Sequence, residues 1–429
     1  MLIEFSVANF RSLRERQTFS LAKAKGDELV ESNAFKAEAF NEFHLLRSVA
    51  IYGPNAGGKS NFLRALRAMR RVVLESASTQ QPGDKLPAVP FRLSRATANA
   101  PSEFEMTFIV DRVRYQYGFS ATPERVHEEW LLAYPKGRPQ RWIDRAWNEE
   151  SRSYDWELGS NLTGEKQLWQ RSTRDNALFL STAVQLNSQQ LQPLYDWFRN
   201  TLRVANIGGW TPGYSASLCE GSEKAQVMDF LRAADIGIED VVVKSEPFDI
   251  KALPDHLSEA MKTLIADELD DRQVMDIKTI HKGNEGDLVT FEFMEESDGT
   301  KKLFSFAGPW IDSLANGRVL FIDELHDNLH PKLVEFLVQL FHNSETNPNN
   351  AQLVFTTHET SILSQTVFRR DQVWFCEKDA KQATSLYPLT DFSPRKGREN
   401  LELAYLSGRY GAVPYVSTAR KIGALRKTA

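Results

Sequence analysis

The spacing of apolar residues divides the start of the chain into short strands and one long helix. From Ile3 to Val7 apolar and polar residues alternate, which is typical of a strand with one buried face. The run VAIY at 49–52 is wholly apolar and stops at Gly53, as expected of a buried strand. From Lys59 to about Glu75 apolar residues recur every three or four positions, which predicts one amphipathic helix directly behind that strand.

Further elements follow along the chain. Residues 103–134 are typical of an antiparallel meander with a turn at Asp111-Arg112, and the spacing over 165–205 and 222–270 is mostly helical. The sequences DVVVKS, LVTFEFM, RVLFID and AQLVFTT each predict a strand, and PKLVEFLVQLF predicts a helix. There is no internal repeat and no sustained heptad pattern in the sequence, which excludes a long coiled-coil arm.

Composition places the chain among globular proteins. It has 429 residues, of which 41% are hydrophobic and 25% charged. A net charge of -5 argues against a protein that coats nucleic acid by bulk electrostatics. Cys219 and Cys376 are far apart, so we expect neither a disulfide framework nor a zinc site. No signal peptide or membrane-spanning run is recognisable, so we expect a cytoplasmic protein without a membrane partner.

A glycine-rich stretch joins the strand at 49–52 to the helix that begins at Lys59. Its residues fit the pattern GxxxxGK[ST] and are followed by an asparagine: Gly53, Pro54, Asn55, Ala56, Gly57, Gly58, Lys59, Ser60 and Asn61. Glycines let backbone N–H groups wrap a phosphate chain, and the helix N-terminus adds partial positive charge. Lys59 can reach the β- and γ-phosphates, and the Ser60 hydroxyl can bind Mg²⁺. The stretch therefore predicts a P-loop that binds ATP, rather than a structural turn.

A P-loop site needs a carboxylate on a neighbouring strand to hold magnesium through water. The apolar strand at 319–322 ends at Asp323, and Glu324 follows at once. Asp323 is therefore the expected Walker B aspartate. Glu324 is the expected general base, which would polarise the water that attacks the γ-phosphate.

The same stretch, FIDELHDNLHP at 321–331, also contains His326 and His330, which suggests a transition-metal site as an alternative. Two histidines four positions apart could share one face of a helix. Pro331, however, is the expected first residue of the helix PKLVEFLVQLF, and proline disfavours helical backbone at the residue before it. Asp327-Asn328 is typical of a turn. We therefore expect that the two-histidine helix site does not form and that the metal is Mg²⁺.

Two further stretches indicate which kind of P-loop protein this is. The strand AQLVFT ends close to His358, and a histidine at that place can contact the γ-phosphate and sense its loss. Upstream of Asp323, an apolar-periodic stretch begins with the sequence SDGT, formed by Ser297, Asp298, Gly299 and Thr300. A serine and a glycine at a helix start form an anion site. SDGT alone is more typical of a turn, but in this order with the other motifs it indicates the signature of an ABC-type ATPase.

With these motifs the chain resembles the AAA-named but ABC-like ATPases of the RloA/AbiL type, which are relatives of the RecF and SMC heads. The resemblance covers almost the whole chain and rests on NFRS at 9–12, GPNAGGKSN, YQYGF at 115–119, ESDGTKK, DELHDNLHP, TTHET and YLSGRYGAVP at 405–414. It implies that Ser297 and Gly299 act on the ATP of a partner subunit, and it places Arg11 close to the nucleotide phosphates. The chain departs from the ABC pattern in having SDGT for LSGGQ and His330 for the D-loop aspartate. A Q-loop glutamine cannot be placed, because the register of Gln116 is open.

The fold implied by the resemblance is α/β. It is an ABC-type P-loop ATPase head, with a mixed central sheet and an antiparallel β subdomain, plus an inserted, largely helical subdomain. We expect an N-terminal ATPase lobe at 1–150, a mainly helical insertion or lid at 151–275, a C-terminal ATPase lobe at 276–385 and a basic segment at 386–429.

The resemblance also implies partners. It suggests a homodimer or higher oligomer that acts as the sensor or regulatory subunit of a bacterial anti-phage system, of the abortive-infection or toxin–antitoxin-like kind. The expected partners are a separate effector, such as a nuclease, a Toprim protein or an RloB-like protein, and a phage-encoded trigger. Nucleic acid is a further candidate.

The same residues leave room for other functions. The main alternative is a RecF-like DNA-binding repair ATPase that contacts phosphates through the insertion or a basic C-terminal patch, although a solvated tail explains that patch more simply. The patch comprises Arg395, Lys396, Arg398, Arg409, Arg420, Lys421, Arg426 and Lys427. No Toprim nuclease is expected, since the 71 residues 359–429 lack a DxD motif and fall short of the roughly 100 residues of such a fold. No NKxD motif indicates a GTPase, and the intact Lys59, Asp323, Glu324 and His358 argue against a module that has lost catalysis.

Overall fold

A computed structural model describes residues 1–40, 42–205, 209–247 and 273–414. The chain forms two compact units: the first comprises Met1–Asn206, Leu314–His326 and Leu337–Ala429, and the second comprises Ile207–Ser313 and Asp327–Phe336. The helix expected over 248–270 and the basic residues Arg420, Lys421, Arg426 and Lys427 lie outside the described ranges.

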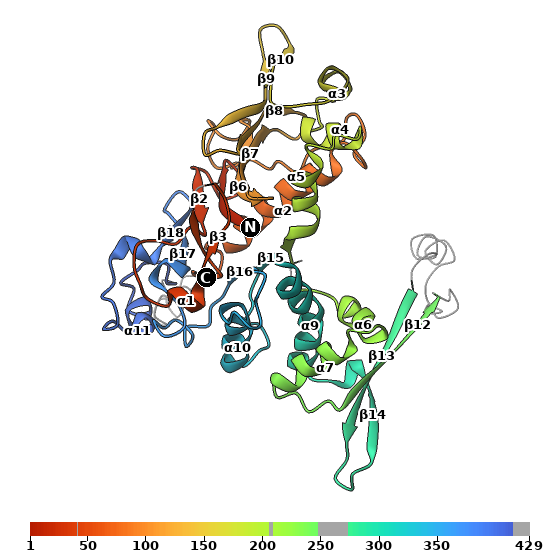
Figure 1. Cartoon of the computed structure of the whole chain (residues 1–429). Helices are drawn as coiled ribbons and strands as arrows, with labels where there is room; N and C mark the ends of the chain where they lie inside the picture. The colour runs from red at the N-terminus through yellow and green to blue at the C-terminus, as the bar shows by residue number, and fades with distance from the viewer. Residues whose placement is uncertain (41, 206–208, 248–272, 415–429) are drawn as a thin grey trace, which may run out of the picture. The chain divides into compact units, whose positions relative to one another are not determined.

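The first unit contains a seven-stranded antiparallel sheet with the strand order β10-β9-β8-β7-β6-β1-β2 (Figure 1). Its strands are β1 (Leu2–Ala8), β2 (Gln17–Ser20), β6 (Ser102–Val110), β7 (Val113–Ala121), β8 (Val126–Tyr134), β9 (Gln140–Asn148) and β10 (Ser153–Leu158). The predicted meander is confirmed, and the hairpin β9–β10 extends it. The turn between β6 and β7 has φ +47° at Asp111 and +64° at Arg112, as a tight two-residue hairpin turn requires.

A second sheet in this unit has the order β11-β15-β16-β5-β17-β18 and is parallel except for the pair β17–β18. Its strands are β5 (Ser48–Tyr52), β11 (Leu202–Val204), β15 (Val319–Ile322), β16 (Gln352–Thr356), β17 (Val373–Lys378) and β18 (Thr384–Pro388). Every residue of β5, β15 and β16 is buried, which explains their continuous apolar runs. A mixed sheet beside an antiparallel one is the architecture of an ABC-type P-loop ATPase head, so the predicted fold class is confirmed.

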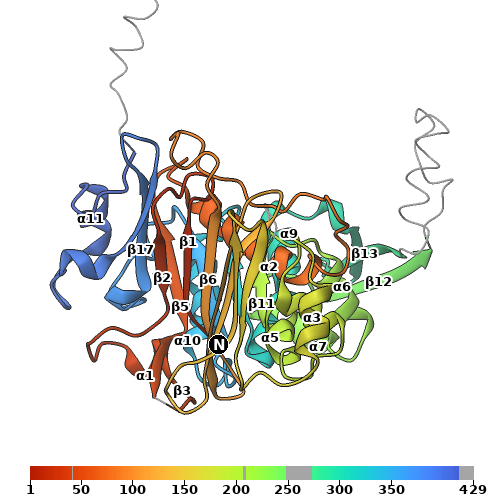
Figure 2. The ribbon, with the colours of Figure 1, turned by 90° about the horizontal axis from the view of Figure 1, so that it is seen from above.

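Helix α2 (Lys59–Glu75) packs against both sheets and has the predicted bounds. Phe62 of α2 lies 5.6 Å from Phe5 and 5.4 Å from Phe19, measured between ring centroids, and both partners belong to the antiparallel sheet. Phe19 in turn lies 5.1 Å from Trp374 of the mixed sheet. Figure 2 shows α2 alongside the strands of the antiparallel sheet. One hydrophobic core therefore fixes the start of α2, where the P-loop ends.

The remaining elements of the chain are short, apart from α10, which begins in the second unit and ends in the first. They are α1 (Val30–Asn33), β3 (Ala34–Ala37), β4 (Phe43–Leu46), α3 (Lys166–Ser172), α4 (Phe179–Gln185), α5 (Gln192–Asp196), η1 (Trp197–Thr201), α10 (Pro331–His342), η4 (Arg370–Gln372), η5 (Leu389–Phe392) and α11 (Leu401–Leu406). The stretch 165–205 is thus broken into short helices that lead into β11. Tertiary contacts explain the breaks: the fully buried Glu129 accepts the N–H groups of Phe179 and Leu180 at 2.6 and 3.0 Å, which starts α4 there.

The second unit combines helices with a three-stranded antiparallel sheet of order β12-β13-β14. Its elements are α6 (Gly213–Glu220), α7 (Lys224–Ala233), β12 (Asp240–Pro247), β13 (Gln273–Lys282), β14 (Leu288–Glu292), η3 (Phe293–Glu295) and α9 (Asp298–Asn316), whose last turn enters the first unit. Residues 325–328 form a turn and α10 begins at Pro331, so the helix site with His326 and His330 does not form. Within the described ranges, every helix is too short or too polar to span a bilayer.

Candidate nucleotide-binding site

The loop between β5 and α2 depends on glycines where it packs against the β17–β18 hairpin. Gly53 has φ +153°, and a Cβ there would lie 2.0 Å from the carbonyl oxygen of Cys376. Gly58 has φ +114°, and a Cβ there would lie 2.1 Å from Thr384 Oγ1. Any side chain at either position would collide with the hairpin. The loop ends at the N-terminus of α2, whose first N–H groups have no acceptor within the helix.

The Lys59 ammonium is held by three acceptors in this structure. It donates to the carbonyl oxygens of Gly53 at 2.7 Å and Pro54 at 3.2 Å, and its Nζ lies 3.0 Å from His358 Nε2. Since an ammonium group only donates, His358 Nε2 accepts, and a neutral ring then carries its proton on Nδ1. Burial, assisted by the charges of Lys59 and His326, lowers the pKa of His358 to about 4, so the ring is neutral near pH 7.

Asp323 and Glu324 are positioned by a residue that the sequence analysis missed. Thr356, the last residue of β16, donates from Oγ1 to Asp323 Oδ1 at 2.6 Å, and the same oxygen accepts the N–H of Glu324 at 2.8 Å. Thr356 is fully buried. Glu324 has φ +53°, a backbone conformation that side chains other than glycine seldom adopt. The threonine hydroxyl therefore helps to hold a strained backbone and orients the Asp323 carboxylate. The available signal was a polar residue at the end of a strand whose central residues are apolar.

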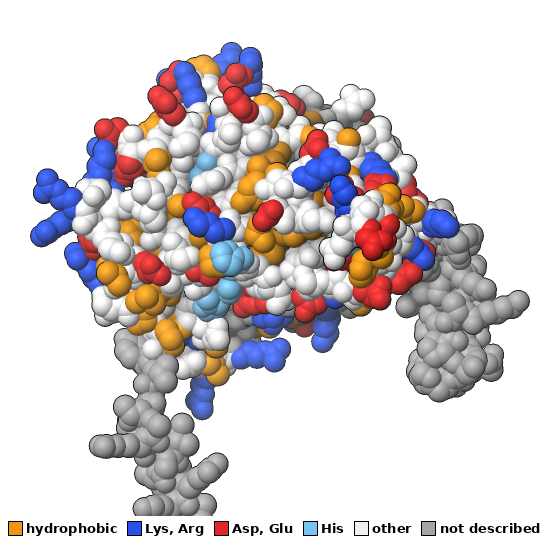
Figure 3. Space-filling view, turned by 90° about the horizontal axis from the view of Figure 1, so that it is seen from below, with side chains coloured by type: hydrophobic (Ala, Val, Ile, Leu, Met, Phe, Trp, Pro, Cys, Tyr) orange, Lys and Arg blue, Asp and Glu red, His pale blue; other side chains and the backbone are white. Residues whose placement is uncertain are grey.

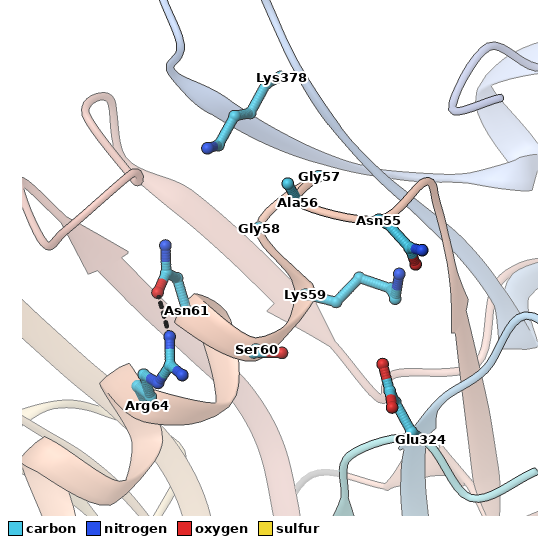
Figure 4. A pocket seen from close by; sticks show the side chains of 10 residues that line it. All are labelled: Asn55, Ala56, Gly57, Gly58, Lys59, Ser60, Asn61, Arg64, Glu324 and Lys378. Atoms are coloured by element: carbon cyan, nitrogen blue, oxygen red, sulfur yellow. Dashed lines mark hydrogen bonds between the residues drawn. The ribbon is translucent and has the colours of Figure 1, made fainter. Parts of the chain in front are cut away.

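Figure 4 shows the cavity that these elements enclose, with a volume of about 280 Å³. The side chains of Lys59 and Glu324 reach toward the same space, while Lys378 of β17 lies on the far side of the loop. Its lining comprises Asn55, Ala56, Gly57, Gly58, Lys59, Ser60, Asn61, Arg64, Glu324 and Lys378. The structure thus brings Glu324 to the P-loop, and it adds Arg64 and Lys378, which were not foreseen. Asp323, His358 and Arg11 are not among the lining residues.

The NFRS segment is tied to the P-loop through Ser12 rather than through Arg11. Asn61 Nδ2 donates to Ser12 Oγ at 2.7 Å. The Arg11 guanidinium has its pKa lowered by burial and by the charges of Arg64 and Arg92. Arg64 lines the cavity, so Arg11 is close to positive charge beside the P-loop. Arg11 itself does not line the cavity.

Both polar atoms of the Gln116 side-chain amide form hydrogen bonds within the antiparallel sheet. Its Nε2 donates to Glu105 Oε2 at 3.0 Å, and its Oε1 accepts the hydroxyl of Tyr134 at 3.0 Å. It does not line the cavity, so the structure offers no Q-loop role for this glutamine.

The signature segment lies in the second unit and opens a helix, as predicted. Ser297 Oγ accepts the N–H of Thr300 at 3.2 Å, which caps the first turn of α9. A Cβ on Gly299 would lie 2.9 Å from the carbonyl oxygen of Asn328, so a larger residue would press on that loop. Ser297 and Asp298 are exposed. A helix N-terminus with an exposed serine is suited to bind a phosphate oxygen.

The side chains near Lys59 fit a magnesium ion better than a transition metal. Ser60 Oγ and the Asp323 carboxylate offer only oxygen donors, the class that Mg²⁺ prefers. In the part of the chain that the structure describes, no group of three or more His, Cys, Asp or Glu residues could hold a metal. The donor set therefore suits an ion that also takes ligands from phosphate.

If the site hydrolyses ATP as its motifs predict, replacing Thr356 with valine is expected to reduce ATP turnover by about tenfold or more, with little change in KM. Valine keeps the shape but leaves Asp323 and the Glu324 N–H without their buried partner, which costs about 1–3 kcal/mol. Steady-state ATPase kinetics would measure the effect. Thr356→Ser should restore most of the rate, and Thr366→Val, an exposed control, should leave it unchanged. Equal rates for Thr356→Val and the parent would show that the hydroxyl does not position the carboxylates.

A family model described as "AAA domain, putative AbiEii toxin, Type IV TA system" matches residues 48–364. A comparison with curated proteins gave no match.

Solved structures that match this chain include heads of SMC proteins. One is an SMC head bound to the C-winged helix domain of ScpA, with 10% identity and a TM-score of 0.44, covering 90% of this chain and 97% of that one. Another is the SMC head domain from Thermotoga maritima, with 13% identity and a TM-score of 0.40, covering 90% and 98%. A third is the Smc head domain with an extended coiled coil bound to the C-terminal domain of ScpA derived from Pyrococcus furiosus, with 11% identity and a TM-score of 0.43, covering 90% and 96%. At these identities the similarity concerns the fold alone.

Proposed function

The chain belongs to the AAA-domain family whose model matches residues 48–364, and we propose that it is an ABC-like ATPase of the RloA/AbiL type that hydrolyses ATP to ADP and phosphate. The observation that carries this proposal is the cavity that Lys59, Ser60 and Glu324 line together. A carboxylate that faces the same space as a phosphate-binding lysine has the position that a general base needs.

Each residue has its own part in the proposed hydrolysis. The N–H groups of the P-loop and Lys59 bind the β- and γ-phosphates. Ser60 and Asp323 would hold Mg²⁺, which would supply neutralising charge to the phosphates. Glu324 accepts a proton from the attacking water. His358, released when Lys59 turns to the nucleotide, contacts the γ-phosphate.

ATP would also join two copies of the chain. This part of the proposal is supported by the resemblance and by Ser297, which is exposed at the first turn of α9. We propose that Ser297 and Gly299 of one copy bind the γ-phosphate held by the other copy, with Asp298 and Thr300 completing the segment. Arg11 would add positive charge near the phosphates.

The biological role proposed is control of an effector. The family description names a toxin and a type IV TA system, and the resemblance points to anti-phage abortive infection. We propose that the ATP-bound dimer is the sensor or regulatory subunit that holds or releases a separate effector, such as a nuclease, in response to a phage-encoded trigger.

A RecF-like DNA-binding ATPase is less well supported. Figure 3 shows basic and acidic side chains interspersed over one face, without an extended basic region there. Lys396 forms an ion pair with Asp27, and Arg409 lies 3.0 Å from Glu399, so part of the basic C-terminal patch is already paired. Salt-sensitive duplex binding that requires ATP would favour this alternative.

Replacing Ser297 with arginine is expected to abolish ATP-dependent dimerisation while each copy still binds ATP within about threefold of the parent affinity. The large cation would occupy the space for the partner's γ-phosphate, but Ser297 belongs to the second unit and not to the P-loop. Sedimentation of the full chain with and without ATP and Mg²⁺ would measure dimerisation, and a fluorescent ATP analogue would measure binding.

The matched control is Ser151→Arg, at an exposed position in the β9–β10 turn. It should dimerise like the parent. A Ser297→Arg variant that dimerises with ATP as well as the control does would contradict the role of the signature.

A further inference from the structure

The edge strand β14 of the second unit carries exposed apolar side chains. Within the described ranges β14 pairs with β13 and with no other strand, and Figure 1 shows it at the outer edge of its sheet. All five of its residues are exposed, including Leu288 at 68%, Val289 at 38% and Phe291 at 38%. Met294, just beyond the strand, is 77% exposed. Uncovered apolar residues on a strand with free backbone groups mark a site for pairing with another chain.

The segment that contains β14 is strongly acidic. Residues 283–298 hold six acidic residues and no lysine or arginine, namely Glu285, Asp287, Glu292, Glu295, Glu296 and Asp298. Some of these carboxylates already have partners nearby: Glu292 accepts a hydrogen bond from Lys278 at 2.8 Å, and Glu296 lies 2.6 Å from His281 Nε2. In the described part of the chain, Glu285 and Asp287 form no ion pair. The free end of the hairpin therefore presents unpaired negative charge beside apolar side chains.

A second copy of β14 would be a poor occupant of this edge. Antiparallel self-pairing about Thr290 would set Leu288 against Glu292 of the other copy, so an apolar side chain would face a carboxylate. It would set Val289 against Phe291, but it would also place Glu285 of each copy opposite Glu295 of the other, and like charges across a strand pair are destabilising. The charge of the edge favours a basic partner instead.

We propose that β14 is a docking edge for an extended segment of a partner protein in which apolar residues alternate with lysine or arginine. Such a segment would add a fourth strand to the sheet, and the backbone hydrogen bonds would supply affinity whatever the side chains. On one face its apolar residues would cover Val289 and Phe291. Asp287 lies on the same face as Val289 and Phe291, so the basic residues that meet Asp287 and Glu285 would be those at the end of the segment, beyond the last residue paired with β14. They would select this partner over an acidic one.

The strand β14 lies close in sequence to the signature segment that begins at Ser297. Only η3 and Glu296 separate β14 from Ser297. If Ser297 acts as proposed above, a partner docked on β14 would be close in sequence to the segment that binds the ATP of a second copy. The docking itself requires no ATP chemistry.

The test uses the full chain without nucleotide and a fluorescein-labelled nonapeptide of alternating lysine and valine. We expect saturable binding by fluorescence anisotropy and slower amide hydrogen exchange in residues 288–292. The double variant Glu285→Lys/Asp287→Lys should weaken binding by at least about tenfold. Glu149→Lys/Glu150→Lys, which makes the same charge change in the β9–β10 turn, should bind like the parent. Leu288→Thr/Phe291→Thr should also weaken binding while the strand remains intact.

Several results would overturn the proposal. One is peptide binding that leaves the exchange of residues 288–292 unchanged, and another is equal affinity for a peptide with glutamate in place of lysine. Concentration-dependent dimerisation without peptide that Leu288→Lys abolishes would assign the edge to a second copy. Because no nucleotide is present, each outcome is independent of whether the chain hydrolyses ATP.

Discussion

The Lys59→Ala variant is expected to lose at least about a hundredfold in affinity for ATP, which corresponds to about 2.7 kcal/mol. Lys59 is the cation of the P-loop, and its Nζ is held near the end of the loop by the carbonyl oxygens of Gly53 and Pro54 and by His358. In a buried setting its charge is worth more to the β- and γ-phosphates than a solvated charge would be. Titration of the full chain with a fluorescent ATP analogue and Mg²⁺ would measure the loss.

Two controls separate binding from folding in this experiment. Lys59 is only 6% exposed, so its replacement also removes buried contacts, and Lys59→Met keeps most of the volume while removing the charge. Lys332→Ala, at a side chain that is 82% exposed, should bind ATP like the parent. Thermal unfolding would confirm that each variant is folded. A folded Lys59→Met variant with the parent affinity would show that the P-loop is not where the nucleotide binds.

The features that could be predicted from sequence depend on neighbours along the chain. The bounds of α2 follow from the glycine loop before it and from one apolar face repeated over four turns. The start of α10 follows from Pro331, whose fixed φ suits the first helical position. The P-loop itself is a local motif, so its residues and their order were readable directly.

The features that could not be predicted depend on strand register and tertiary contact. Thr356 reaches Asp323 because β15 and β16 are parallel and Ile322 lies opposite Phe355, although the bonded residues are 33 positions apart in the sequence. Lys378 reaches the cavity because β17 pairs with β5. Neither pairing leaves a signal in the local pattern.

The broken helices of 165–205 have the same kind of origin. Their apolar spacing is helical, but the backbone follows contacts from elsewhere, such as the N–H groups that Glu129 accepts at the start of α4. Tertiary contacts here outweigh the helical spacing of the apolar residues in this segment.

The Glu324→Gln variant is expected to bind ATP like the parent, to hydrolyse it at least about a hundredfold more slowly, and to accumulate as an ATP-bound dimer. Loss of a general base typically costs a factor of about 10² to 10⁴ in rate. Glutamine has nearly the same size and can keep the φ of +53° at this position, so the loop geometry should persist. Only the ability to accept a proton from the attacking water is removed.

Phosphate release and sedimentation with ATP and Mg²⁺ would measure the two effects on one sample. Glu345→Gln, at an exposed position outside the cavity, should match the parent in both. The position of the carboxylate beside Lys59 is what distinguishes Glu324 from such a control, since both substitutions remove one negative charge. If Glu324→Gln releases phosphate at the parent rate, the base must be another group, and the strained backbone at 324 would then serve only to place Asp323.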